Sequence, residues 1–141
     1  MIVVTINYRL GPLGWFTHPA IQNLQDGIDK TSNFGTLDII SALEWVNKNI
    51  NLFGGDPQNI TIFGESAGGH NVLSLIVSKQ AKGLFHKAIS MSGYTESISL
   101  EVLINKNNNL QPQIILPGML LIILLRINLI RMIKINIVIK N

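Results

Sequence analysis

Apolar residues along the first 91 positions recur with the spacing of strands and helices. Runs of β-prone residues predict strands over 2–8, 60–63 and 87–91, the first of them buried. The mostly polar stretch 18–33 predicts a loop. The first part of the chain is therefore expected to hold three strands.

Two helices are predicted between these strands. Apolar residues at 37, 40, 43, 46 and 50 predict a helix over 36–50. A second helix is predicted over 67–79, with an apolar side made of Val72, Leu73, Leu75 and Ile76. Strands that alternate with helices favour an α/β fold built from parallel strands.

The segment between the second strand and the second helix fits G-x-S-x-G, with Gly64, Ser66 and Gly68. A turn directly from a strand into a helix brings the residues two before and two after its apex close together, so only small residues fit there. The turn directs the serine hydroxyl out of the sheet, near the positive end of the helix. There the Ala67 N–H can hold a developing oxyanion. This pattern predicts a nucleophilic serine at position 66.

The longer stretch FGGDPQNITIFGESAG, residues 53–68, resembles the serine signature of the type-B carboxylesterase family, the cholinesterase-like branch of the α/β-hydrolase fold. The family's other segments follow in order as NYRLGPLG at 7–14, NFG at 33–35, ALEWV at 42–46 and GLF at 83–85. The resemblance runs from about residue 2 to about residue 94. It implies a partial α/β-hydrolase, a mostly parallel sheet fragment with flanking helices, that acts on small carboxylic esters.

The resemblance also implies roles for single residues. Ser66 would form an acyl-serine intermediate, with a histidine as its base and a carboxylate that orients the histidine. In the family these partners follow the serine, but the tail over residues 100–141 has one acid, Glu101, and no histidine. The family's glycine-rich oxyanion loop precedes the first strand, so the chain is expected to start inside a domain. The 141 residues are therefore expected to be inactive on their own.

Other charged residues receive secondary roles. By resemblance, Glu65 is a buried carboxylate that shapes the field near the serine, and Arg9 and Asp38 form a structural ion pair. The chain's own histidines are expected to be surface or locally bonded residues and not the base; they are His18, His70 and His86.

Composition changes this picture little. Residues 1–99 carry six Lys/Arg and seven Asp/Glu, whereas residues 100–141 carry five and one, so the net charge of +3 belongs to the end of the chain. Nothing in the first part predicts a nucleic-acid partner.

The sequence has no cysteine, which leaves the cellular compartment undetermined. We predict no metal site and no cofactor. The aromatic residues Trp15, Phe16 and Trp45 are expected in the core.

Residues 100–141 form an Ile/Leu/Asn/Lys-rich tail that does not follow the family pattern, and we expect it not to be an evolved domain, in contrast to residues 1–99. A membrane segment is disfavoured, because the apolar stretch 114–125 is shorter than the roughly 20 residues of a span and Arg126 follows it. Two alternatives to an esterase stay open. One is a non-catalytic cholinesterase-like binding protein, and the other is a membrane-tethered or non-functional gene product.

Overall fold

In the computed structural model of the chain, residues 1–97, 99, 113–114 and 135–139 are described. They belong to two units. The first unit comprises Met1–Asn7, Asp38–Thr95 and Arg131–Asn141, and the second comprises Tyr8–Leu37 and Glu96–Ile130. The membrane alternative for residues 114–125 falls almost entirely outside the described residues.

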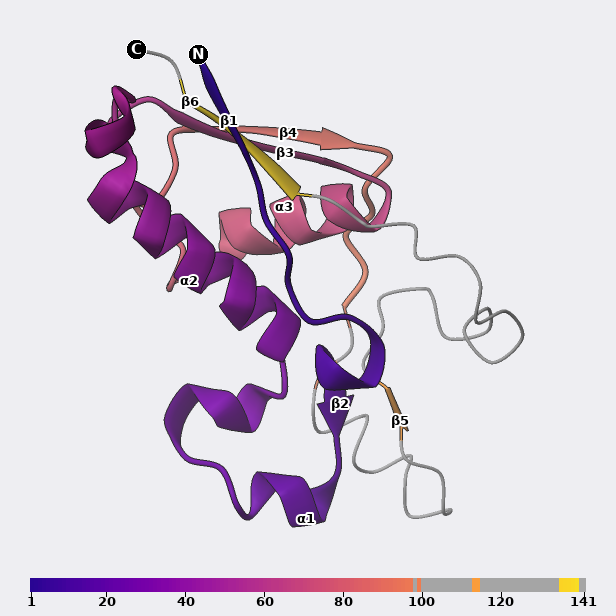
Figure 1. The fold of residues 1–141 in the computed structure, drawn as a ribbon. Helices are drawn as coiled ribbons and strands as arrows, with labels where there is room; N and C mark the ends of the chain where they lie inside the picture. Colours follow the sequence, from indigo (N-terminus) through magenta and orange to yellow (C-terminus); the bar gives the residue numbers. More distant parts are fainter. Residues whose placement is uncertain (98, 100–112, 115–134, 140–141) are drawn as a thin grey trace. The chain divides into compact units, whose positions relative to one another are not determined.

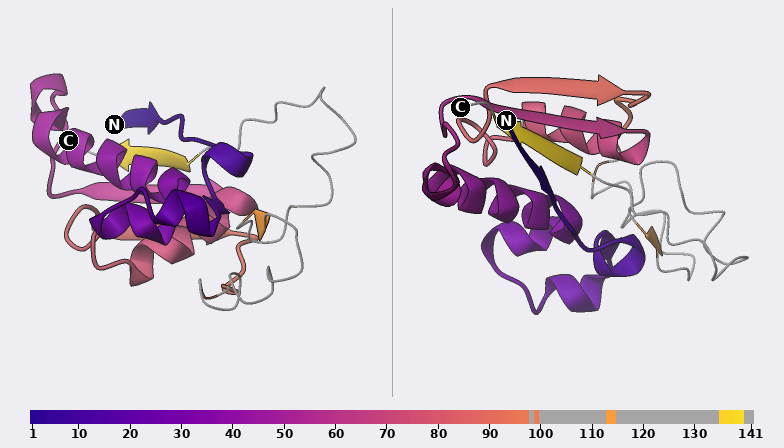
Figure 2. Two further views of the ribbon diagram at one scale, coloured as in Figure 1. Left: turned by 90° about the horizontal axis from the view of Figure 1, so that it is seen from below. Right: turned by 45° about the horizontal axis from the view of Figure 1, so that its top comes forward.

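The first unit contains a four-stranded sheet in the order β1 (Ile2–Thr5), β6 (Ile135–Ile139), β3 (Ile60–Glu65), β4 (Lys87–Met91) (Figure 1). Strands β3 and β4 are parallel, as expected, and β6 is antiparallel to both of its neighbours. Figure 2 shows β6 lying between β1 and β3. The α/β class is confirmed. The sheet is mixed, however, because a segment of the predicted tail supplies a fourth strand.

Strand β1 is shorter and less buried than predicted. It ends at Thr5, and its residues alternate between partial exposure and exposure, with Val3 exposed. Among the described residues β1 lies at an edge of the sheet, since β6 is its only strand partner. One face of an edge strand can remain in solvent, which accounts for this alternation.

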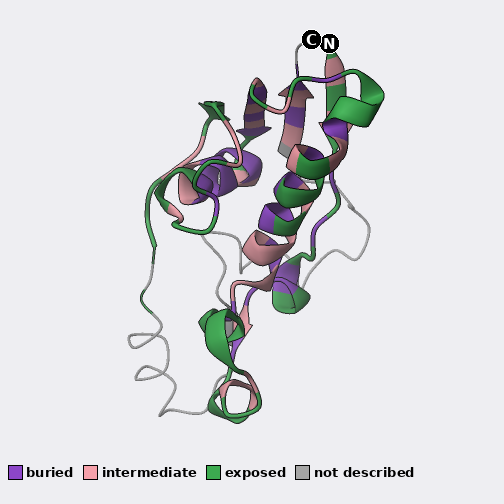
Figure 3. Ribbon diagram, turned by 90° about the vertical axis from the view of Figure 1, so that its left-hand side faces the viewer, coloured by how far each residue is buried: buried purple, intermediate pink, exposed green. Residues whose placement is uncertain are grey.

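Helix α2 (Phe34–Asn49) forms close to the predicted range and continues into the 3₁₀ turn η3 (Ile50–Phe53). Its predicted apolar side is buried except at Leu37, which is partly exposed, and Leu43 and Val46 are almost inaccessible; Figure 3 shows buried and exposed segments alternating along the helix. The prediction that Trp45 belongs to the core is wrong. Its side chain is 52% exposed and packs against the exposed Phe53 ring, with centroids 6.1 Å apart.

Helix α3 (Ala67–Val77) connects β3 to β4 and packs against both strands (Figure 1). Val72 and Leu75 are fully buried, as the apolar pattern predicts. Ile76, from the same predicted side, is 53% exposed, which corrects that part of the prediction. The helix ends two residues earlier than predicted, because Ser78 has an extended backbone with φ −75° and ψ 125°.

The second unit contains short elements. They are η1 (Gly11–Leu13), β2 (Phe16–Thr17), α1 (Pro19–Gln22), η2 (Gly27–Thr31) and β5 (Gln113–Ile114), which pairs with β2 in antiparallel register. The stretch 18–33, predicted as a loop, therefore includes two short helical segments. Trp15 is buried as predicted. It meets the Tyr8 ring edge-on with centroids 6.1 Å apart, and its indole N–H donates to Thr36 Oγ1 over 3.3 Å.

Candidate active site

Ser66 occupies the apex of a sharp turn between β3 and α3. Its backbone has φ 56° and ψ −118°, a conformation that is strained for a residue with a side chain. The Ser66 N–H donates to the Met91 carbonyl at the end of β4 over 2.9 Å, so the neighbouring strand fixes the apex. The residue is exposed. A strained and anchored serine with an accessible side chain is the geometry that the G-x-S-x-G pattern predicts.

The two glycines of the pattern are in close contact. A Cβ atom added to Gly64 would lie 2.5 Å from the carbonyl carbon of Gly68 and 2.6 Å from its oxygen. Both of these atoms belong to the backbone, so no side chain can move aside to make room. The expected steric reason for a small residue is therefore present at position 64, while the need for one at 68 and the part these residues play in catalysis stay predictions.

A second group of small residues supports the turn, and the sequence analysis did not identify it. A Cβ atom on Gly69 would lie 2.5 Å from the Met91 carbonyl oxygen. The Ser90 hydroxyl donates to the Gly69 carbonyl over 3.0 Å, and Gly93 lies directly against Gly69. The first turn of α3 thus packs against the end of β4. The sequence offered one signal for this packing, the pair Ser92-Gly93 directly after the predicted strand 87–91.

The first backbone N–H groups of α3 are directed toward the serine side of the turn. Ala67 begins the helix, and the N–H groups of a first helical turn have no acceptor within the helix. They also lie at the positive end of the helix dipole. The Ser66 carbonyl, in contrast, is engaged, since it accepts from His70 N–H over 3.0 Å. Ala67 N–H can therefore donate to an oxyanion formed at Ser66.

Glu65 does not have the environment that the resemblance implies. It is the last residue of β3 and is exposed, not buried. Within the described part of the chain, nothing encloses its carboxylate. An exposed carboxylate is screened by water and exerts a weak field on a neighbouring serine. A secondary role for Glu65 therefore stays a prediction. It requires that other residues shield the carboxylate at this end of β3 from water.

Each of the three histidines makes a local contact. His70 is buried, its Nδ1 lies 2.5 Å from the Tyr94 carbonyl oxygen, and its ring stacks on the Tyr94 ring with centroids 4.4 Å apart. His86 Nδ1 accepts from Ile60 N–H over 3.2 Å. Ile60 starts β3, six residues before Ser66, so this contact is about 20 Å from the serine at the rise of a strand.

His18 belongs to the second unit, where its Nδ1 caps α1 by accepting from Ala20 N–H over 3.2 Å. Together with the contacts of His70 and His86, this agrees with the expectation that the histidines are locally bonded. His86 is too far from Ser66 to act as its general base, and the Nδ1 of His70 is already engaged by the Tyr94 carbonyl.

The predicted ion pair joins residues of different units, Arg9 in the second and Asp38 in the first. Within its own unit, the Arg9 guanidinium lies over the Phe34 ring, 5.3 Å from the centroid, a cation–π contact. Both charged residues have further interactions. The ion pair itself stays a prediction.

The described residues contain no group of three or more His, Cys, Asp or Glu side chains able to hold a metal ion. Among the described helices, none has the length and apolarity needed to cross a bilayer.

Comparison with known proteins gives consistent results. The model of the carboxylesterase family matches residues 1–113. Para-nitrobenzyl esterase of Bacillus subtilis is 48% identical over 101 residues, which are 72% of this chain and 20% of that protein. Human cocaine esterase is 52% identical over 95 residues, 66% of this chain and 15% of that protein.

The solved structures agree with the sequence matches. A PNB esterase structure superposes with a TM-score of 0.62 at 42% identity, covering 72% of this chain and 20% of the other. A thermophilic PNB esterase gives a TM-score of 0.59 at 45% identity. The chain therefore spans about a fifth of the length of these PNB esterase structures.

Proposed function

Because this chain belongs to the carboxylesterase family, we propose that it carries the nucleophile of a carboxylic-ester hydrolase and that Ser66 is this nucleophile. The observation that carries the proposal is the strained, exposed Ser66 at the junction of β3 and α3, with Gly64 and Gly68 in backbone contact beneath it. This arrangement presents a hydroxyl at the positive end of a helix, where an attacking serine and its oxyanion need to be.

The reaction that follows from this geometry is acyl transfer. The Ser66 oxygen attacks the ester carbonyl carbon, and the Ala67 N–H donates to the oxyanion of the tetrahedral intermediate. Loss of the alcohol leaves an acyl-serine, which water then hydrolyses to release the carboxylate. Both steps require a base that takes a proton, first from Ser66 and then from water.

We propose that this base comes from outside the 141 residues. The Nδ1 of His70 is engaged by the Tyr94 carbonyl, His86 bonds the start of β3, and His18 caps a helix in the other unit. An oriented histidine is a large part of such catalysis, and its loss typically costs several orders of magnitude in rate. The 141-residue chain should therefore hydrolyse p-nitrophenyl acetate no faster than its Ser66→Ala variant.

A chimera tests the nucleophile separately from the missing base. The aligned residues of this chain replace the 101 matched residues of the Bacillus subtilis para-nitrobenzyl esterase, which is 48% identical there. The chimera should hydrolyse a para-nitrobenzyl ester. Ser66→Ala in the chimera should lower kcat/KM by about 10⁴- to 10⁶-fold.

Ser41→Ala serves as the matched control, because Ser41 is an exposed serine on α2. This variant should leave kcat/KM unchanged. A folded chimera without activity, or one that keeps its activity after Ser66→Ala, would refute the assignment of the nucleophile.

A further inference from the structure

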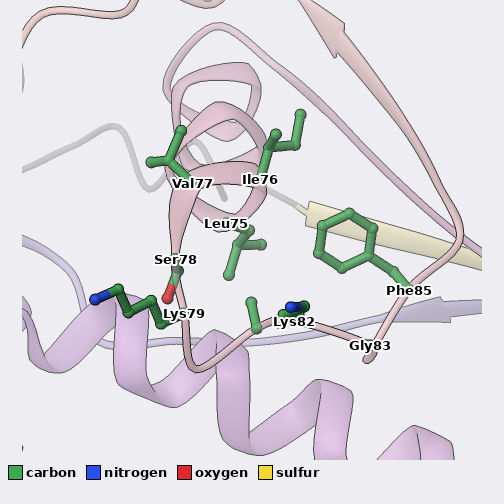
Figure 4. A pocket seen from close by; sticks show the side chains of 9 residues that line it. Leu75, Ile76, Val77, Ser78, Lys79, Lys82, Gly83 and Phe85 are labelled. Atoms are coloured by element: carbon green, nitrogen blue, oxygen red, sulfur yellow. The ribbon is translucent and has the colours of Figure 1, made fainter.

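A second candidate binding site lies in the first unit, at the opposite end of α3 from Ser66. The last turn of the helix and the loop over residues 78–85 enclose an open groove of about 400 Å³ (Figure 4). This volume is within the range of small-molecule sites in proteins, about 300–1,000 Å³. The groove includes none of the residues that shape the turn at Ser66.

The wall of the groove is apolar. Leu75 and Ala81, which are almost completely buried, lie beneath it, and Figure 4 shows Leu75 directed toward the loop. Ile76, which is 53% exposed, and the half-buried ring of Phe85 stand at one side. An apolar ligand laid along Ile76 and Phe85 would remove their exposed hydrocarbon from water, which is favourable by roughly 25 cal/mol per Å².

The rim of the groove is positively charged. Lys79 and Lys82 line it and are exposed, and within the described residues neither ammonium has a side-chain hydrogen bond or an ion pair. The sequence contains no Asp or Glu between Glu65 and Glu96. The only other lysine of this stretch, Lys87, is engaged, because its ammonium donates to Asn59 Oδ1 over 2.7 Å. The groove therefore combines hydrocarbon with two available cations.

This combination selects among ligands. A neutral apolar molecule would cover the wall and leave both ammonium groups unpaired. A small inorganic anion would pair with the ammonium groups and leave the wall in water. The last carbonyl groups of α3 also repel anions, so an anionic group must lie on the lysine side of the groove.

We propose that this groove binds a free amphipathic carboxylate, with its head group at Lys79 and Lys82 and its hydrocarbon tail along Ile76 and Phe85. Such molecules are one class of product that ester hydrolysis releases. The proposal does not depend on Ser66, because the groove includes no residue of the turn.

Calorimetric titration with decanoate, kept below its micelle concentration, tests this site in the full 141-residue chain. We expect saturable binding and weaker binding of 1-decanol, which lacks the charge. Lys79→Gln combined with Lys82→Gln should weaken decanoate binding about tenfold, which corresponds to two exposed ion pairs. Lys48→Gln is the matched control, since Lys48 is an exposed lysine at the end of α2, and it should leave the affinity unchanged.

A variant in the apolar wall of the groove tests the binding of the ligand's hydrocarbon part. Ile76→Asn changes a half-exposed side chain and should fold, which circular dichroism checks, and it should weaken decanoate while leaving any binding of inorganic phosphate unchanged. The proposal is overturned if decanoate does not saturate, if the double lysine variant binds it as tightly as the original chain, or if decanol or phosphate binds equally well.

The same titration on the Ser66→Ala chain separates this proposal from the proposed function. Decanoate should bind that variant with unchanged affinity. An inactive chimera would remove the ester-hydrolase assignment and leave the groove standing, whereas an active chimera without decanoate binding to the chain would remove only the groove.

Discussion

The two sides of the sheet in the first unit are built in different ways. At the β3–β4 side, backbone contacts form within the one segment 60–91, since Gly64 touches Gly68 and Ser66 is anchored to Met91. At the β1–β6 side, the strands pair across almost the whole chain, with Ile2 opposite Ile139. The first side is fixed by short-range sterics and the second by burial of side chains that meet only after folding. A short motif can therefore encode the first side but not the second.

The largest effect is expected where this long-range pairing buries a side chain. Ile139 of β6 is fully buried and lies against Gly55, opposite both Ile2 and Ile60. Ile139→Ala should lower the free energy of unfolding by about 2–5 kcal/mol, through lost burial and the cavity it leaves. Urea denaturation measures this.

Ile89→Ala is the control for that experiment, because Ile89 is a half-exposed isoleucine on the edge strand β4. It should cost less than about 1 kcal/mol. If both variants cost the same, β6 does not contribute a buried strand, and the contrast between the two sides disappears.

A smaller loss of stability is expected at the turn, together with a local structural change. Gly64→Ala places a methyl group against the Gly68 backbone and should cost about 1–3 kcal/mol. The hydrogen bond from Ser66 N–H to Met91 should weaken with it. Amide hydrogen exchange at Ser66 would then become faster relative to the rest of β3.

Gly83→Ala is the matched control. Gly83 has φ +83° but nothing within 4 Å of an added Cβ, so alanine there should cost about 1 kcal/mol through backbone strain alone. Exchange at Ser66 should stay as in the original chain. Equal exchange at Ser66 in the two variants would mean that the Gly64–Gly68 contact does not hold the turn.

The smallest effect concerns the side chain that ties α3 to β4. Ser90→Ala removes the partly buried hydrogen bond to the Gly69 carbonyl and should cost about 1 kcal/mol. Ser78→Ala removes an exposed hydrogen bond to Gln80 and should cost nearly nothing by thermal or urea unfolding. A negligible loss for Ser90→Ala would leave the turn held by backbone contacts alone.

The contrast also explains which parts of the fold the sequence could predict. The spacing of Gly64, Ser66 and Gly68 predicted the turn, because its geometry depends on five adjacent residues. Helices α2 and α3 and strand β4 followed from local periodicity. The pairing of residues 135–139 with β1 and β3 could not be predicted, because strand pairing leaves no mark in the local pattern and these residues lie in a tail that does not follow the family pattern.

Exposure was less predictable than secondary structure. Trp45 was expected in the core and Ile76 on the apolar side of α3, yet both are half-exposed, because a helix buries only as much surface as its neighbours cover. Glu65 was expected to be buried and is exposed for the same reason. Burial depends on what packs against an element, which one chain's local sequence does not state.

The most direct test of the account is nuclear magnetic resonance of the 141-residue chain at the turn itself. The account predicts a nuclear Overhauser effect between the Gly64 and Gly68 α-protons, together with an amide proton at Ser66 that exchanges slowly because it donates to Met91. Absence of this effect with fast exchange at Ser66, in a chain whose β3 and β4 amides are protected, would show that these residues do not build the turn by themselves.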